Sequence, residues 1–579
     1  MTSLKRLRAG IASAGVLMAL PGMMICCSAT LAVAQGVTPT VLTSKMIRSM
    51  PGVDITRIKT PLAQPASGTA VTTIPLADTF RLHSQATATK TIYLDFDGHT
   101  TINTPWNTGS GAITTAPFTL DSNRAFSNTE LLAIQEIWRR TAEAFSPFNV
   151  NVTTQEPPLA DLINSGGSDT RWGIRVLIGT STPSPAPDAG GVAFLNSFPA
   201  SADVPCFVFP ASLANTSKFI ADATIHEVGH TLGLDHDGRI SPAEGYYYGH
   251  GSGVTGWAPH MGVGYEQNLV QWSKGEYLSA NNLEDDLAII TTRNGFTYLA
   301  DDYANDRTSA AAINGTRGLG AAANIFNVAQ TGVITTRTDT DWFKLTVGNG
   351  TLVLTATGGI ANTMLDIQMD LYTSTGSLLA SSNPTDQLTA SINRNVTAGV
   401  YYVRIDGVGN GQVLGTGYSD YGSIGTYNIA GSFVAPPTVV SSRVVASYSS
   451  ATKTLALTGD GMGNSLTVTL QAGSLKVEGA NGTSIGIVGS GGAITTVPST
   501  TFAHTGKLIL TADLGDGDDA IAVLGVDSST TNISLGNGSD RAAFTLCNIG
   551  TLSVNGGAGT DVITTTSSTI GQFNGTSIP

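Results

Sequence analysis

Residues 226–236 read HEVGHTLGLDH, and no other stretch of the chain constrains its local fold as strongly. On a helix, residues four apart share a face, so the imidazoles of His226 and His230 can point at one metal ion. Gly233 can take a positive φ without a Cβ clash, which suits it to end that helix. The reversed chain can then bring in His236 as a third ligand. The motif therefore predicts a zinc site with an open fourth position.

The chemistry expected at this site is hydrolysis. Three neutral imidazoles leave the charge of a zinc ion undiminished, so the pKa of a water molecule in the open position should fall to about 7. Glu227 directly follows the first ligand and can serve as the general base that deprotonates this water. We therefore expect one catalytic zinc ion per chain, with His226, His230 and His236 as metal ligands and Glu227 as the catalytic residue.

The H-E-x-x-H-x-x-G-x-x-H pattern resembles that of the metzincin metallopeptidases, and Asp237 after the third histidine is similar to their reprolysin-like branch. Metzincins carry a methionine-containing turn beneath the metal ligands. The resemblance assigns this structural role to Met261, which follows His236 at a suitable distance within WAPHMG. Some families place a tyrosine two residues after this methionine, where this chain has Val263. The nearest tyrosine is Tyr265, which is not given a catalytic role.

The first residues predict export. Basic residues precede the apolar run of residues 12–20, and residues 32–34 (AVA) supply a small-x-small cleavage site. Residues 1–34 are therefore interpreted as a Sec-type, bacterial signal peptide. A lipoprotein signal at Cys26 is the alternative, but Ile25 stands where a small residue is expected. No later segment reaches the ~18 apolar residues that a membrane span requires, so we expect a secreted, extracellular protein without a membrane span.

Composition bears on the partners and on the fold class. The formal net charge of −13 argues against a nucleic-acid partner. Charged residues make up 12% of the chain against a usual ~25%, and 67 of 579 residues are glycine, which favours β-rich modules with many turns. The expected partners are protein or peptide substrates, and no oligomeric state is predicted. Cys206 and Cys547 fall in different expected domains, so no disulfide framework is predicted.

Residues 35–87 are rich in Thr, Pro, Ala and Ser and show little periodicity. They are interpreted as a prosegment, which would make the protein a zymogen, and a disordered leader is the competing interpretation. The segment holds no cysteine, so a cysteine ligand cannot close the metal site. Asp54, Asp78 or His83 could cap the metal instead.

Residues 88–298 are expected to form an α/β catalytic domain, the layout that the metzincin resemblance implies. Residues 127–130 form a capping box at the start of a long amphipathic helix, and the metal helix should begin near Ser217. Residues 190–193 (GGVA) would lie near the edge strand that pairs with an extended substrate, although a simple hairpin fits the glycine pair equally well. A last helix is expected over residues 282–290.

Residues 300–433 carry no catalytic motif and show short alternating strands bounded by turns, which predicts an all-β sandwich. They resemble the bacterial pre-peptidase C-terminal (PPC) domain, a module that accompanies secreted peptidases. Their aromatic side chains fit a sandwich core better than a matrix-binding face. Residues 434–441 contain two consecutive prolines and are interpreted as a linker.

The last segment, residues 442–579, carries an internal repeat. The sequences GDGDD, GNGSD and GAGTD recur at intervals of 21 residues. A fixed period with Gly-x-Gly turns predicts the stacked rungs of a parallel β-helix or a related β-solenoid. Rungs stack about 4.8 Å apart, so Asp519, Asp540 and Asp561 would form a column of like charges that needs calcium or strong solvation.

The expected architecture is therefore multidomain: an α/β metzincin-like catalytic domain, an all-β sandwich and a C-terminal solenoid-like repeat. The expected function is that of a secreted zinc-dependent endopeptidase. The alternative is a surface- or matrix-binding adhesion-type protein whose peptidase domain holds zinc with little or no activity. The presence of Glu227 argues against this alternative, because an inactivated protease often loses its base.

Overall fold

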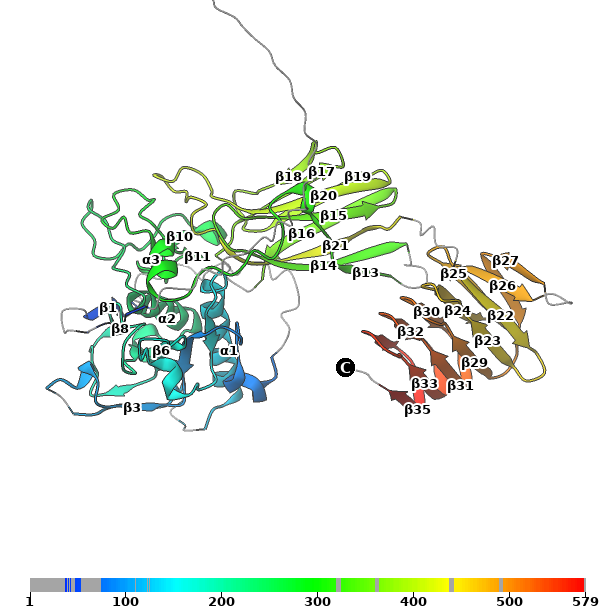
Figure 1. The fold of residues 1–579 in the computed structure, drawn as a ribbon, viewed down its shortest axis with the longest axis horizontal. Helices are drawn as coiled ribbons and strands as arrows, with labels where there is room; N and C mark the ends of the chain where they lie inside the picture. The colour runs from blue at the N-terminus through cyan, green and yellow to red at the C-terminus, as the bar shows by residue number, and fades with distance from the viewer. Residues whose placement is uncertain are drawn as a thin grey trace, which may run out of the picture. The chain divides into compact units, whose positions relative to one another are not determined.

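The computed structural model describes residues 37–38, 40, 42, 47–53, 74–109, 111–121, 123, 125–318, 324–359, 364–436, 442–488 and 493–576 (Figure 1). The expected signal peptide, residues 1–34, and Asp54 lie outside these residues. Strands predominate over helices in the described chain and form several separate sheets, which confirms a β-rich, multidomain organisation. Among the described residues, no helix combines the length and the apolar character that crossing a bilayer requires.

A six-stranded sheet forms the framework of the N-terminal domain. Its order is β1-β8-β9-β6-β2-β5, with β1 Ile47–Pro51, β8 Ala189–Phe194, β9 Cys206–Val208, β6 Trp172–Ile178, β2 Lys90–Asp95 and β5 Asn151–Thr153. The strands from β9 to β5 are parallel, whereas β8 and β1 run antiparallel to their neighbours. β2, β6 and β9 are buried along their whole length, as strands covered on both faces are. Residues 190–193 thus lie in a strand, and β1 from the leader covers the outer edge of that strand.

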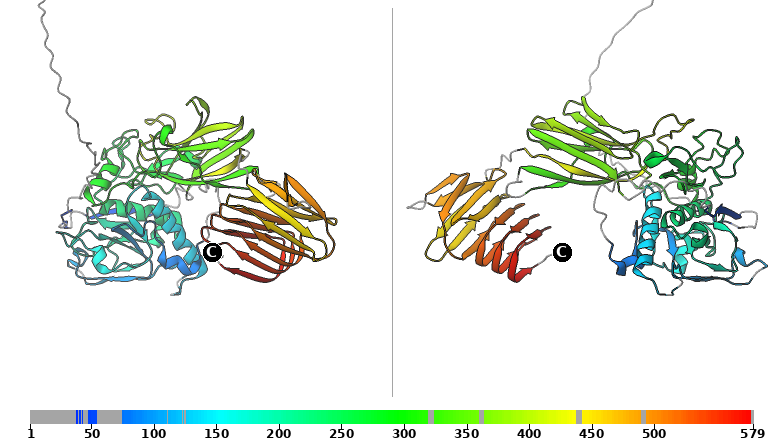
Figure 2. Two further views of the ribbon diagram at one scale, coloured as in Figure 1. Left: turned by 45° about the vertical axis from the view of Figure 1, so that its right-hand side comes forward. Right: turned by 180° about the vertical axis from the view of Figure 1, so that it is seen from behind.

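Two long helices, α1 (Asn128–Ala144) and α2 (Ser217–Thr231), pack against each other (Figures 1 and 2). α1 begins as predicted: the Glu130 carboxylate accepts the backbone N–H of Ser127 at 2.7 Å, and the Ser127 hydroxyl accepts the N–H of Glu130. α2 contacts α1 and also β8, β9 and β6 of the sheet, so nearly all of its side chains are buried. The predicted start of the metal helix near Ser217 is confirmed.

The third helix begins later than predicted. The expectation was a helix over residues 282–290, but α3 spans Asp286–Arg293. The Asp285 side chain accepts the N–H of Ala288 at 2.9 Å and so fixes the N-terminus of the helix. Upstream of this cap, the Glu284 carboxylate accepts the N–H of Asp235 at 2.9 Å. The preceding residues therefore belong to a loop that supports the metal motif.

Two smaller sheets complete the N-terminal domain. One is antiparallel and contains β3 (His99–Thr101), β4 (Ile113–Thr115) and β7 (Ser181–Thr182). The other pairs β10 (Trp257–Pro259) with β11 (Leu269–Gln271) in parallel, and the turn after β10 carries Met261 beneath α2. Cys206 is buried and unpaired, as is Cys547 in the last domain, so the described residues contain no disulfide.

The next region is a β-sandwich. One sheet has the order β12-β15-β20-β17-β18, with Ala311–Ala312, Thr340–Val347, Gly399–Gly407, Ile367–Thr373 and Leu378–Ser382. The other has the order β13-β14-β21-β16-β19, with Gly315–Arg317, Ile325–Ile334, Gly425–Val434, Gly350–Gly358 and Ala390–Val396. Burial alternates along β15 and β20, as it does when one face of a sheet covers a core. Phe343, Tyr427 and Phe433 are buried in that core, as predicted, whereas Trp342, Tyr372 and Tyr402 are only partly buried.

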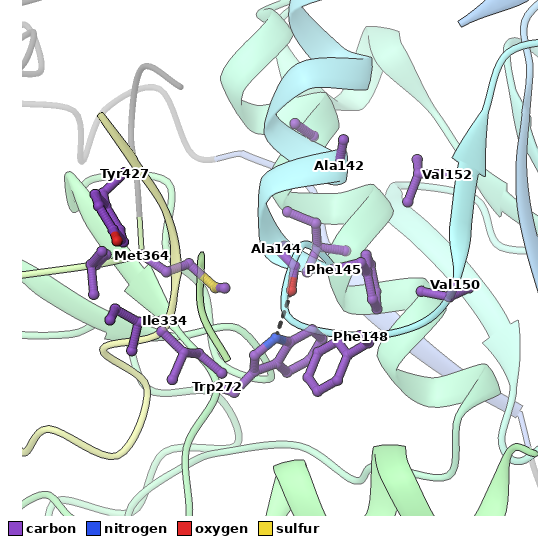
Figure 3. Close-up of a cluster of buried hydrophobic side chains, with 14 of the residues drawn as sticks. Ala142, Ala144, Phe145, Phe148, Val150, Val152, Trp272, Ile334, Met364 and Tyr427 are labelled. Atoms are coloured by element: carbon purple, nitrogen blue, oxygen red, sulfur yellow. Dashed lines mark hydrogen bonds between the residues drawn. The ribbon is translucent and has the colours of Figure 1, made fainter. Parts of the chain in front are cut away.

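The core of the sandwich is continuous with the core of the N-terminal domain. One buried apolar cluster contains Phe145 at the end of α1, Trp272 after β11, and Met364 and Tyr427 of the sandwich (Figure 3). Within it, the Trp272 indole donates to the carbonyl of Ala144 at 2.9 Å. The sandwich therefore packs on the segment that follows the metal motif.

The C-terminal domain consists of two sheets. The larger has the order β27-β26-β22-β23-β29-β31-β33-β35, with Ile494–Val497, Ser484–Val488, Arg443–Ser449, Thr454–Thr458, Leu508–Asp513, Asp527–Ser534, Asn548–Asn555 and Thr569–Thr576. The smaller has the order β28-β25-β24-β30-β32-β34, with Ser499–Ala503, Ser474–Ala480, Ser465–Gln471, Ala520–Leu524, Arg541–Thr545 and Val562–Thr566.

The predicted 21-residue rung is present in these sheets. From β29 onward the neighbouring strands are parallel, and Leu510 pairs with Thr531, which pairs in turn with Leu552. The segment from β22 to β28 pairs mainly as antiparallel hairpins. The rungs thus begin later than residue 442, because the first end of the stack is closed by hairpins, as terminal units of repeat arrays commonly are.

Candidate metal centre

Two histidines of the motif project from α2, and the third reaches them after the chain reverses. Gly233 has φ +101°, so the predicted left-handed conformation at the end of the helix is present. One nitrogen from each of His226, His230 and His236 forms a group whose atoms all lie within 4.8 Å of one another. The structure therefore brings all three predicted ligands together.

Backbone carbonyls orient the two helical imidazoles. His226 Nδ1 donates to the carbonyl of His260 at 2.9 Å, and His230 Nδ1 donates to the carbonyl of Leu234 at 2.7 Å. Because a carbonyl can only accept, the proton resides on Nδ1 and the lone pair is on Nε2. This is the tautomer that a metal ligand needs.

The free nitrogens fit a metal ion. Nε2 of His226, His230 and His236 is buried and has no hydrogen-bond partner in the described structure. Burial and the neighbouring His236 lower the pKa of His226 to about 3, and burial is also the main reason that the pKa of His236 falls to about 4. The imidazoles are therefore neutral near pH 7. Three neutral nitrogen donors converging on one point suit Zn²⁺.

Glu227 is fully buried beside this group. Its Oε1 accepts the backbone N–H of Met50 at 3.0 Å, whereas its Oε2 has no partner among the described residues. Burial raises the pKa of the carboxyl well above its usual value. A Cβ on Gly191 would lie 2.6 Å from the Cγ of Glu227, so β8 can pass over the carboxylate only because glycine stands there. The carboxylate is thus placed to exchange a proton with a group bound along β8.

Met261 lies beneath α2. Its side chain is completely buried, and a Cβ on Gly229 would meet its sulfur at 2.4 Å. The Met261 carbonyl also accepts the N–H of Asp237 at 2.9 Å, which ties the turn to the residue after the third histidine. Met261 therefore packs against α2 at Gly229, between His226 and His230 in the sequence, and its role as a methionine turn stays a prediction.

Two tyrosines reach the site. The ring of Tyr246 lies 4.5 Å from that of His236, and its hydroxyl donates to the carbonyl of Ser49 at 2.5 Å. The hydroxyl of Tyr265 donates to the carbonyl of Pro51 at 2.9 Å. Tyr246 was missed by the sequence analysis; the only available signal was the run of three tyrosines that follows the motif.

The leader reaches the site through its backbone. The prediction that His83 could cap the metal is wrong, because its ring contacts Gln155 at 2.9 Å and Asn151 at 3.0 Å. Asp78 lies in a short 3₁₀ helix, Leu76–Arg81, and does not belong to the metal group. Of the described leader residues, Ser49 and Met50 contact Tyr246 and Glu227.

A second group of potential metal ligands lies at the sandwich. Carboxylate oxygens of Asp301, Asp339 and Asp341 lie within 4.8 Å of one another. Asp339 and Asp341 are buried, and each has one oxygen without a partner. The sequence analysis did not identify this group, because nothing in the spacing of the residues indicated that Asp301 would join Asp339 and Asp341.

The aspartate column of the repeat is joined by backbone donors. The N–H of Asn464 donates to Asp519, the N–H of Asp519 donates to Asp540 at 2.7 Å, and the N–H of Asp540 donates to Asp561 at 3.2 Å. Each carboxylate thus accepts a hydrogen bond from the neighbouring rung. Calcium binding by this column stays a prediction.

Comparisons with known proteins do not assign the chain to a family. No family model matches the chain, and no curated protein matches it. A solved structure of the pre-peptidase C-terminal domain of collagenase from Bacillus anthracis is 16% identical, with a TM-score of 0.14; the match covers 18% of this chain and 86% of that one. This is a weak likeness of one part of the chain.

Proposed function

We propose that the protein is a secreted zinc-dependent endopeptidase. One observation carries the proposal: three unpartnered Nε2 atoms converge on one point, with the buried carboxylate of Glu227 beside them. A structural zinc site would use four protein ligands, whereas three ligands and an adjacent acid suit catalysis. The export signal, residues 1–34, supports action outside the cell.

The residues of the chain have distinct roles in this reaction. Zinc, held by His226, His230 and His236, would polarise the peptide carbonyl and lower the pKa of water. Glu227 accepts a proton from the attacking water and passes it to the leaving amide nitrogen. The Tyr246 hydroxyl already donates to a backbone carbonyl here, so it can stabilise the oxygen on which negative charge develops.

The accessory domains bear on the choice between two functions. The sandwich shares a core with the catalytic region, and the repeat adds a long β-surface. These domains are also the basis of the alternative function, a surface- or matrix-binding protein with an inactive zinc site. The two functions differ in one respect: only a peptidase needs a carboxylate with a free oxygen beside the metal ligands.

Digestion of casein or gelatin tests the proposal. The purified chain, with its leader removed, should contain about one zinc per molecule and digest the substrate. A chelator should abolish digestion, and added zinc should restore it. A zinc-loaded protein that leaves both substrates intact would favour the adhesion-type alternative.

A further inference from the structure

The leader strand β1 lies where a substrate would lie. It pairs antiparallel with β8, with Arg48 opposite Ala193, Ser49 opposite Val192 and Met50 opposite Gly191. Strand addition of this kind satisfies the backbone of a bound peptide and leaves its side chains to be selected by pockets. The leader thus uses the same edge that an extended substrate needs.

One peptide bond of β1 is placed against the catalytic groups. The carbonyl of Ser49 accepts the Tyr246 hydroxyl at 2.5 Å, and the N–H of Met50 donates to Glu227 at 3.0 Å. In peptide hydrolysis the carbonyl must face the groups that stabilise its oxygen, and the amide nitrogen must face the proton donor. The Ser49–Met50 bond meets both requirements.

The neighbouring contacts hold this bond in position. Arg48 Nε lies 2.6 Å from the carboxylate of Asp235, the residue before the third ligand. On the other side, the carbonyl of Pro51 accepts the Tyr265 hydroxyl, and the N–H of Val53 donates to Ser212 at 2.8 Å. Contacts on both sides of the bond restrict its movement along β8.

Burial along β1 indicates which side chain is selected. Met50 is 1% exposed and belongs to the main buried cluster, whereas Ile47 is 38% exposed. A methionine side chain is unbranched and apolar, so the pocket after the bond accepts a long apolar side chain. Ser49 places a small residue before the bond.

We propose that the leader is the first substrate of the enzyme and that the chain cuts its own Ser49–Met50 bond; this rests on the peptidase function proposed above. Water supplies a hydroxyl group to the carbonyl carbon of Ser49. Its proton, carried by Glu227, goes to the nitrogen of Met50 as the C–N bond breaks. The products are a carboxylate at Ser49 and a new amino terminus at Met50. The same contacts define the external substrate: an extended peptide with a methionine-like residue after the cleaved bond.

The first test compares the wild-type chain with Glu227→Gln. Intact mass and N-terminal sequencing should show a new terminus at Met50 in the wild type and an uncut leader in the variant. The cleavage rate should not change over a tenfold dilution, because the reaction is intramolecular, and digestion of casein should appear with the same time course. Cutting of Glu227→Gln at this bond would overturn the proposal.

A second measurement does not depend on activity. In metal-free Glu227→Gln, the backbone amides of residues 47–50 should exchange with deuterium at least tenfold more slowly than in a free peptide of the same sequence. Exchange at the free-peptide rate would show that the leader is not docked, and would overturn the proposal.

Substitutions test the pocket. Met50→Asp should slow self-cleavage at least about 10²-fold, because it places a charge in a buried site. The matched control is Met462→Asp, since Met462 is 52% exposed and lies in the C-terminal domain, and it should leave the rate unchanged. If Met50→Asp does not fold, a synthetic peptide of residues 45–55 replaces it and should be cut between its Ser and Met.

A failure of the self-cleavage proposal can be distinguished from a failure of the proposed peptidase function. A wild-type protein that digests casein but keeps Ser49–Met50 intact, or cuts its leader elsewhere, remains a peptidase and overturns only the inference. A zinc-loaded protein, its leader removed by another protease, that cuts neither casein nor the synthetic peptide overturns the proposed function itself.

Discussion

The candidate metal centre and the C-terminal repeat both contain buried ionisable groups, but the two regions differ in how their unpartnered atoms are arranged. At the candidate metal centre, three imidazole nitrogens converge without partners, and one oxygen of Glu227 is also buried without a partner. In the repeat, Asp519 and Asp540 are also buried, and each accepts a backbone N–H from the neighbouring rung through Oδ1, while its Oδ2 has no partner among the described residues. Buried polar atoms are normally satisfied, so the three open nitrogens gathered at a single point indicate a ligand site, whereas the open oxygens of the repeat are spaced one to a rung and form no such group among the described residues.

The substitution Glu227→Gln should distinguish the candidate metal centre from the repeat most clearly. The variant keeps the shape of the site but cannot accept and return a proton, so kcat/KM on a peptide substrate should fall by about 10² to 10⁴. Zinc content and thermal unfolding should match the wild type. A zinc-loaded Glu227→Gln within about threefold of wild-type activity would contradict the assigned role.

His236→Ala should weaken zinc binding, because two histidines on one helix make an incomplete site. Loss of even an outer-shell partner lowers metal affinity by about 10- to 100-fold, so loss of a ligand should exceed about 10². Competition with a chelator measures this change. The matched control is His504→Ala, since His504 lies in the repeat domain, where it is hydrogen-bonded to Tyr448. Equal zinc affinity in His236→Ala and in the wild type would contradict the assignment of His236 as the third ligand.

A pair of glycine substitutions sharpens the comparison. Gly191→Ala would place a Cβ 2.6 Å from Glu227, so it should displace the base and reduce kcat/KM by about 10²-fold. Gly557 has φ +82° and its Cβ would lie 1.8 Å from the carbonyl of Gly536 in the next rung. Gly557→Ala should therefore destabilise the repeat by about 1–3 kcal/mol and leave peptide cleavage unchanged. Thermal unfolding and kcat/KM of both variants test these expectations. A loss of activity in Gly557→Ala alone would contradict the distinction between the two regions.

The motif predicted the clustering of the three histidines because its information is local. The spacing of His226, His230 and His236 and the turn at Gly233 depend only on helix geometry and on backbone conformation. The contributions of Tyr246 and Met50 depend on long-range packing, which no spacing in the sequence encodes. The sequence left open whether the leader is disordered or is a prosegment whose side chain could cap the metal, and in the structure its backbone contacts Tyr246 and Glu227.

The same distinction explains the rest of the fold. The 21-residue rung was predictable because the repeat is periodic, and the start of α1 because Ser127 and Glu130 form a capping box. The start of α3 was not, since Asp285 caps the helix after a loop whose apolar residues continue the helical pattern. The aspartate cluster at the sandwich likewise joins Asp301 to residues that are remote in the sequence.

The smallest effect is expected from pH and calcium in the repeat. Burial is the main cause that raises the pKa of Asp519 to about 8 and that of Asp540 to about 6. A carboxyl with a raised folded pKa contributes stability that is present below its unfolded pKa, near 4, and is lost as the pH rises through the folded value. The unfolding temperature of the repeat should therefore decrease by a few degrees between pH 5 and pH 9.

Calcium should restore the unfolding temperature if the column of Asp519, Asp540 and Asp561 binds the ion. In Asp519→Asn the pH dependence should shrink. If unfolding of the full chain is the same in calcium and in a calcium chelator at pH 9, the backbone donors and solvent alone stabilise the column.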